Sequence, residues 1–313
     1  MANTRLEQLL KDASSGGFTA LRELLRFLRK EKLRRPDLCM EYAPKLLKFR
    51  HSLGDELWTI HEQMAVAAMD LGDLVVADGE LKVLQKKFKD SQRVRRLEGM
   101  LQEARGDLTA AGKIYEAMVE KNPANQLARK RQVAVLIAQG DKPKAVKALN
   151  AYLSEFAADG EAWLQLAKLH IEVLNYEAAA FCYEEIVLIA PSDHLAHCRL
   201  AEVYYTMGGE LSWGRGVEHL MRARKHFSQS VDLVKQGNAR ALHGLCQTCA
   251  SLASNRSASK MFMAQGKERE VNQALHLFAA TELRKAYSLG NKEITSLVDG
   301  VLSAQAAGLS GHS

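Results

Sequence analysis

Apolar and polar positions along the chain follow the spacing of amphipathic helices, and this helical pattern itself recurs every 34 residues. Four glycines share one register of that period, and four alanines stand five residues after it. The glycines are Gly72, Gly106, Gly140 and Gly208, and the alanines are Ala77, Ala111, Ala145 and Ala179. A fixed period of this length is typical of proteins built from stacked helical repeats. The pattern therefore predicts an array of helix pairs.

Five units in phase begin at Trp58, Gln92, Gln126, Gly160 and His194. Each unit is predicted to form two helices joined by a turn at the glycine, with small residues where the helices approach closely. The small residues of the first helix are Ala65, Gly99, Val133, Ala167 and Ala201, and large residues that fill the gap to the next unit are Leu81, Tyr115, Leu149 and Tyr183. Pro123 and Pro191 come at the end of the second helix, which a proline cannot continue.

The unit at 160–193 carries Trp163, Leu166, Ala167, Ala179, Tyr183 and Pro191 at the spacing of the tetratricopeptide repeat, and the chain resembles that family. Other units are less regular, with Arg95 or Arg129 in the tryptophan position. The resemblance implies an all-α fold, a right-handed α-solenoid of 34-residue helix-turn-helix repeats. Trp163 is then expected to pack within its own repeat.

The repeats predict four parts of the chain. Residues 1–57 form an N-terminal helical cap, with helices at 18–32 and 36–49, because an end unit otherwise exposes its apolar face. The repeat array covers 58–254. Its fifth unit has a second helix delayed by GELSWGRGVE until about Ala223, and a degenerate unit follows. Capping helices cover 255–304, and the tail 305–313 is expected to be disordered.

Composition agrees with an ordered helical protein, since 47% of the 313 residues are hydrophobic and 26% are charged. No apolar stretch approaches the length of about 20 residues that crosses a bilayer, and the first residues lack the apolar core of a signal peptide. The five cysteines are an odd number at irregular spacing, which favours a reducing compartment over a disulfide framework.

Charge is unevenly distributed along the chain. Residues 1–150 have 28 basic and 20 acidic side chains, a net charge of +8, whereas residues 151–313 have a net charge of −2. A basic half suits an acidic partner, an anionic membrane surface or RNA. A solvated helical surface is the alternative interpretation. Few aromatic residues are available to stack on bases, so we expect no nucleic-acid partner.

Positions 2, 5, 9 and 12 of each unit line the concave groove in tetratricopeptide folds. Here they include Arg93, Arg96, Lys130, Lys168, Glu62, Glu161 and Glu202. We expect the four cations to hold an acidic segment of a partner protein, and Trp58 and Trp213 to serve as exposed anchors. No unit has asparagine at position 9, which argues against the clamp that binds chaperone C-termini.

Catalytic and cofactor chemistry is not indicated by any motif. Cys246 and Cys249 form a lone CxxC with His243 three residues before it, but a structural zinc ion needs four ligands. We interpret the two cysteines as buried packing residues. His197 and Cys198 are interpreted as packing residues between repeats. The prediction is a protein without catalytic residues, metal or cofactor.

Several segments together carry a closer resemblance. They are DELWTIHEQMAVAAMDLGD (55–73), KVLQKKFKDSQRVRRLEGML (82–101), NPANQLARKRQVAVLIAQGDKPKAVKALNAYLSEF (122–156), DGEAWLQLAKLHIE (159–172), YEAAAFCYEEIVLIAP (176–191) and LAEVYYTMGG (200–209). In this order and spacing they resemble the family of the second subunit of the endoplasmic reticulum (ER) membrane protein complex.

That resemblance implies a non-catalytic scaffold of an insertase for tail-anchored and multi-pass membrane proteins. It implies a peripheral location on the cytosolic face of the ER membrane, with indirect membrane association. The implied partners in this hetero-oligomer are cytosolic segments of membrane subunits and a soluble cytosolic subunit. The alternative is a tetratricopeptide adaptor or co-chaperone of another assembly.

Overall fold

The computed structural model describes residues 2–210, 215–255, 257–258, 260, 262, 267–288 and 292–310, and every regular element in them is an α-helix. The chain divides into two compact units, Met1–Ala148 and Leu149–Ser313, and the boundary falls within helix α10. The predicted all-α fold is confirmed. Among these residues no helix combines the length and the apolar character needed to cross a bilayer.

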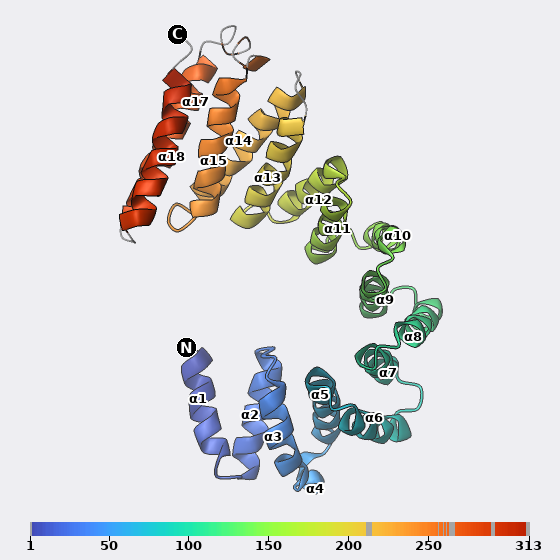
Figure 1. Ribbon diagram of the computed structural model, residues 1–313. Coiled ribbons are helices and arrows are strands. Elements are labelled where there is room, and N and C mark those ends of the chain that lie inside the picture. The colour runs from blue at the N-terminus through green and yellow to red at the C-terminus, as the bar shows by residue number, and fades with distance from the viewer. Residues whose placement is uncertain are drawn as a thin grey trace. The chain divides into compact units, whose positions relative to one another are not determined.

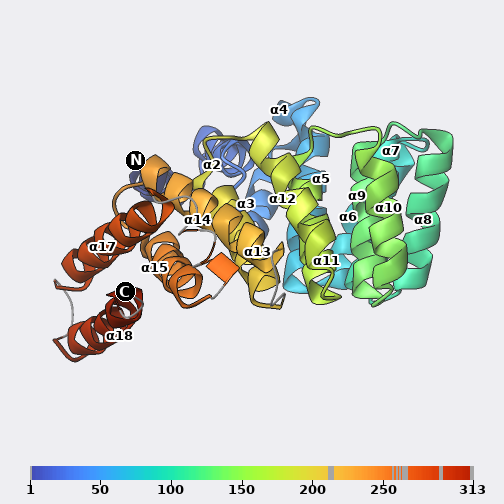
Figure 2. The same ribbon diagram turned by 90° about the horizontal axis from the view of Figure 1, so that it is seen from above.

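The helices of the first unit follow one another as neighbours (Figure 1). They are α1 (Ala2–Ala13), α2 (Phe18–Lys30), α3 (Pro36–Leu47), α4 (Arg50–Leu53), α5 (Glu56–Leu71), α6 (Leu74–Lys87), α7 (Gln92–Ala104), α8 (Leu108–Lys121), α9 (Gln126–Ala138) and the first part of α10 (Lys142–Leu153). Figure 2 shows α7, α8 and α9 packed side by side.

The second unit contains the remaining repeats and the C-terminal helices. They are α11 (Gly160–Glu172), α12 (Tyr176–Ile189), α13 (His194–Glu210), α14 (Arg215–Leu233), α15 (Ala239–Ser254), α17 (Lys267–Ser288) and α18 (Lys292–Ser310). Helix α18 packs against both α15 and α17. Helices α7, α9, α11 and α13 begin at the residues where the 34-residue period starts a unit.

The residues expected to pack the repeats are buried. They are Ala77, Ala111, Ala145, Ala167, Ala179, Ala201, Leu81, Tyr115, Leu149, Trp163 and Tyr183. Gly99 shows why small residues stand between paired helices. A Cβ atom there would lie 2.5 Å from the Tyr115 ring, so a larger residue would force the two helices apart. The Trp163 indole donates a hydrogen bond to the carbonyl of Ala157, at 2.8 Å, which ties it to the end of the preceding repeat.

One type of turn ends the first helix of several repeats. At Gly72 the chain turns with a φ of 77°, Asp73 donates its backbone N–H to the carbonyl of Ala68, and the Asp73 side chain caps the next helix. This is the helix-ending arrangement in which a left-handed residue favours glycine. Gly106 and Gly140 adopt the same conformation, with φ of 81° and 78°.

The turn recurs where the sequence has no glycine. Leu174 stands 34 residues after Gly140 and has a φ of 60°, and Asn175 donates to the carbonyl of His170 as Asp73 does to Ala68. Pro123 and Pro191 follow the ends of α8 and α12 by two residues.

Three expectations for the second unit are wrong. Gly208 does not make a turn, because α13 continues to Glu210; a Cβ atom on Gly208 would instead lie 2.7 Å from Leu220. The delayed helix begins at Arg215, earlier than Ala223, and buries Val217 and Leu220.

The expected disordered tail is the third difference. Helix α18 continues through residues 305–310 and ends at Ser310. Leu302, on the turn before this extension, is buried, and the Gln305 side chain donates to the side-chain carbonyl of Gln247 on α15 at 2.8 Å. Residues 311–313 lie outside the described part of the chain.

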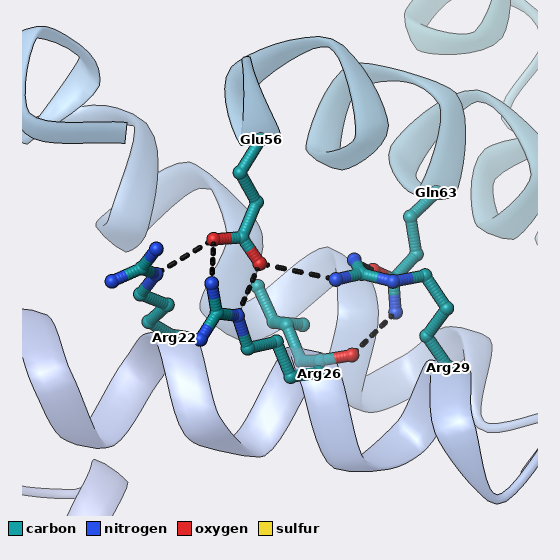
Figure 3. A network of polar contacts seen from close by, with 6 residues as sticks. Arg22, Arg26, Arg29, Glu56 and Gln63 are labelled. Carbon is teal, nitrogen blue, oxygen red and sulfur yellow. Dashed lines mark hydrogen bonds and ion pairs between the residues drawn. The ribbon is translucent and has the colours of Figure 1, made fainter. Parts of the chain in front are cut away.

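A charged cluster joins the N-terminal cap to the first repeat (Figure 3). Arg22, Arg26 and Arg29 lie on one face of α2 and all reach the carboxylate of Glu56, the first residue of α5, at N–O distances of 2.6 to 3.1 Å. Burial of Glu56 opposes its ionisation, but the three arginine hydrogen bonds outweigh burial and lower the pKa of Glu56 to about 2. Gln63, two turns along α5, donates to the carbonyl of Leu25 and accepts from Arg29.

Replacing Leu174 by glycine is expected to stabilise the protein by about 0.5–1 kcal/mol, because a leucine with positive φ is strained and its side chain is 71% exposed. Gly140→Ala, the matched opposite change, should destabilise it by about 1 kcal/mol. Urea unfolding of both variants measures the two effects. A less stable Leu174→Gly variant would show that contacts of the leucine outweigh the strain.

A second prediction concerns the stability of the protein at acid pH, which depends on Glu56. Its pKa is about 2 in the folded protein and near 4.5 when unfolded, so its stabilisation is complete above pH 4.5 and is lost as the pH falls toward 2. The shift corresponds to about 3 kcal/mol. Glu56→Gln should lose about this stability at pH 7 and flatten the pH dependence below 4.5 in urea unfolding. Glu41→Gln, which removes only an exposed pair with Lys45, should change little.

Candidate partner-binding surface

Trp58 and Arg93 line one cavity on the first helices of neighbouring repeats. This cavity of about 360 Å³ lies between α5, α6 and α7, with Leu84, Val94 and Leu97 in its apolar wall. Trp58 is half-buried. Its ring meets the Phe88 ring edge-on, with centroids 5.5 Å apart, and the Lys87 ammonium lies 5.5 Å from its centroid. The predicted anchor is therefore already packed against its own repeat, with one side facing the cavity.

Glu62 holds the two predicted groove arginines of α7. Arg93 donates from Nε to a Glu62 oxygen at 2.8 Å, and Arg96 lies 3.5 Å from the same carboxylate. Hydrogen bonding to Glu62 raises the pKa of Arg93. Two cations on one carboxylate leave an excess of positive charge at this surface, which suits an acidic ligand.

The next repeat contains a similar group. Tyr115 donates to Glu103, and Arg131 lies 3.2 Å from the other carboxylate oxygen. Burial and this carboxylate together raise the pKa of Tyr115 far above its usual range, so the hydroxyl stays protonated. Lys130, beside Arg131 on α9, is half-buried. Trp213, the other predicted anchor, lies outside the described residues.

Lys168 lies in a larger cavity of the second unit. This cavity of about 690 Å³ is lined by α11, by the end of α12 and by the start of α13. Glu161 and Arg199 add charge to the lining, whereas Leu164, Ile189 and Leu195 line it with exposed apolar side chains. Leu195 is 57% exposed, although it occupies a helix of the repeat core. The surface combines apolar area with both signs of charge.

Sequence reasoning named the charges of this surface and missed its apolar residues. Leu195, Leu164 and Ile171 occupy positions 2, 5 and 12 of their units, which the same positional rule assigns to the groove. The positional rule that selected Lys168 would have found them, because a leucine at a groove position has no repeat partner to cover it.

The cysteines are free and buried, as the interpretation of packing residues predicts. Burial raises the pKa of Cys182, Cys246 and Cys249 to about 12 and that of Cys198 to about 11. Thiols with these pKa values are not nucleophiles at neutral pH. Among the described residues no three His, Cys, Asp or Glu side chains are arranged to hold a metal ion.

His197 packs between repeats. Its Nε2–H donates to the carbonyl of Pro191 at 3.1 Å, and its Nδ1 shares a hydrogen bond with Nδ1 of His226, also at 3.1 Å. The two rings are stacked, with centroids 5.3 Å apart. Burial and the neighbouring His197 lower the pKa of His226 to about 4. The His226 ring is therefore neutral at pH 7, and the two stacked rings act as packing groups.

Comparison with known proteins first defines the class. Residues 74–217 match the family model described as the EMC2 TPR-like repeat domain. The crystal structure of the C-terminal part of a TPR repeat-containing protein from Cytophaga hutchinsonii superposes with a TM-score of 0.54 at 12% identity, covering 92% of this chain and 98% of that one. The chain therefore has a tetratricopeptide-like repeat fold.

The relatives then define the family. The chain is 37% identical over 276 residues to ER membrane protein complex subunit 2-A of Xenopus laevis, which covers 88% of each protein. It is 36% identical over 220 residues to ER membrane protein complex subunit 2 of Dictyostelium discoideum, covering 69% of this chain and 68% of that protein. The chain belongs to the family of ER membrane protein complex subunit 2.

The buried thiols give a prediction that separates packing from chemistry. At pH 8 the native protein should react with an aromatic disulfide reagent at least about a hundredfold more slowly than the unfolded chain, in which all five thiols react. Ser52→Cys, which adds an exposed thiol, should introduce one fast phase. A fast phase in the unmodified native protein would contradict the assignment of all five cysteines to packing.

Proposed function

We propose that the chain is a non-catalytic scaffold subunit of the ER membrane protein complex, located at the cytosolic face of the membrane. It holds cytosolic segments of membrane-embedded subunits, and a soluble cytosolic subunit, against the face formed by the first helices of its repeats. Through these contacts it contributes to an insertase for tail-anchored and multi-pass proteins. Its association with the membrane is indirect, through the partner subunits.

The apolar surface around Lys168 is the observation that supports this proposal most directly. Leucines of a repeat core are covered by the neighbouring repeat, whereas Leu164 and Leu195 line an open cavity beside Lys168. Apolar side chains gathered in a concave surface with a few charges are typical of a protein-binding site. Buried apolar area then provides the affinity, and the charges set the register of the bound segment.

The ion pairs of the first-helix face suit a role in holding a partner. Arg93 and Glu62 belong to adjacent repeats, and so do Arg131 and Glu103. Each pair joins two repeats and leaves further cations nearby, so a bound acidic segment meets a surface that is already ordered. Less conformational entropy is then lost when the segment binds.

Affinity purification of the tagged chain from detergent-solubilised membranes tests the proposal. We expect a stoichiometric set of multi-spanning ER proteins to co-purify with it. Recovery of soluble chaperones alone would contradict the scaffold role and favour an adaptor of another assembly.

Charge reversal tests whether the predicted groove residues carry the interaction. The double variant Arg96→Glu, Lys130→Glu should recover about fivefold less of the partner proteins, because each reversal replaces attraction by repulsion at the acidic segment. Lys113→Glu, Lys147→Glu is the matched control, since both lysines are exposed. If both double variants recover the same amount of partner protein and keep their unfolding midpoints, Arg96 and Lys130 do not take part in partner binding.

A further inference from the structure

A second cavity of the first unit lies at the turn between α2 and α3. It has a volume of about 290 Å³ and opens between this turn and the first-helix residues Thr59, Glu62 and Val66 of α5. Its floor is apolar, since Leu28, Cys39 and Ala67 line it and are buried there. The cavity has room for one or two apolar side chains of a ligand.

The rim of this cavity is cationic. Five of its lining residues are basic and two are acidic; the basic residues are Arg29, Lys32, Arg34, Arg35 and Arg93, and the acidic residues are Glu62 and Asp70. Both carboxylates are already engaged. Asp70 accepts two hydrogen bonds from Arg34, at 2.6 and 2.8 Å, and Glu62 pairs with Arg93 and Arg96.

The carboxylates outside the lining are engaged too. Arg35 pairs with Asp37, and Arg29 shares Glu56 with two other arginines. Lys32 is exposed, and its side chain has no partner within the described residues. The rim therefore has a net positive charge that the protein itself does not balance.

The backbone at Lys32 is shaped like the glycine turns of the repeats. Lys32 has a φ of 52°, Leu33 donates to the carbonyl of Leu28 at 2.9 Å, and Lys32 donates to that of Arg29 at 3.3 Å. A glycine is the residue that this position favours. The lysine brings a charge to the rim at the cost of a strained backbone.

We propose that this cavity binds a peptide segment of a partner protein in which one apolar side chain is flanked by carboxylates. The apolar side chain enters the floor between Leu28 and Ala67, and the carboxylates pair with Lys32 and the rim arginines. A concave apolar floor inside a cationic rim matches such a segment better than a bilayer, whose charged surface is flat and wide. The inference deepens the proposed function, because it gives the chemistry of one segment that the scaffold holds.

Fluorescence anisotropy with the full purified chain tests the proposal without the rest of the complex. The probe is a fluorescein-labelled peptide, Gly-Asp-Glu-Leu-Glu-Asp-Gly. We expect it to bind saturably, and the same peptide with alanine in place of leucine to bind about fivefold more weakly, because it leaves the floor empty. Absence of binding, or equal binding of the two peptides, would overturn the proposal.

Three variants locate the bound peptide. Lys32→Glu should weaken binding about fivefold or more, whereas Lys113→Glu, an equal charge change on the exposed face of α8, should weaken it less than twofold. Lys32→Gly should raise the unfolding midpoint, because it relieves the strained turn, and should still weaken binding. Lower stability cannot account for that combination. Equal effects of Lys32→Glu and Lys113→Glu would overturn the proposal.

The two remaining measurements separate this inference from its alternatives. Lys32-dependent binding to phosphatidylserine vesicles, with no binding to the peptide, would assign the cationic rim to a membrane surface. Co-purification of Lys32→Glu with the ER subunits is measured independently. If Lys32→Glu loses peptide binding but still co-purifies with the ER subunits, the scaffold role stands. If the unmodified chain fails to co-purify with the ER subunits, the scaffold role is contradicted and the peptide-binding proposal is not.

Discussion

The structure depends on one packing constraint: a helix pair cannot bury its own apolar face, so the next pair must cover it. Close approach of the helices makes this possible, and small residues set how close they come. Ala77, Ala111 and Ala179 are fully buried at the same position of their repeats. Gly99 lies directly against the Tyr115 ring, where no Cβ atom fits. Because contacts of this kind join only neighbouring helices, stability is built locally along each unit.

The same constraint creates the candidate binding surface. When one helix pair covers the next, the sides of the first helices are buried against neighbouring helices. One face of each first helix is left uncovered by the repeats. Along that face arginines pair with glutamates of adjacent repeats, as Arg93 does with Glu62 and Arg240 with Glu202. At the N-terminal cap three arginines of one helix pair with a single glutamate, Glu56. The face is therefore ordered by its own charges before any partner binds, and apolar side chains such as Leu195 lie open beside them.

Much of the fold could be predicted because the period is local information. The unit starts at Gln92, Gln126, Gly160 and His194 coincide with helix starts. The turn at Leu174 could not be predicted from the type of residue alone. The three residues that precede it in the 34-residue register are the positive-φ glycines Gly72, Gly106 and Gly140, and the repeat geometry imposes their conformation on a leucine. Gly208 is the opposite case, a glycine in the same register that makes no turn. It lies inside α13, where Leu220 packs against it.

The sequence by itself determined the repeat class and the helix pairs, because both follow from spacing along the chain, and the resemblance to tetratricopeptide repeats predicted which positions face the groove. Only the tertiary structure decided which of those positions form a surface that can bind. Leu33 and Val66 are far apart in sequence and line one cavity, and Lys32 joins them because a turn holds it at positive φ. Cavities depend on the distances between helices, and those distances are set by side chains from several helices at once, which no single stretch of sequence records.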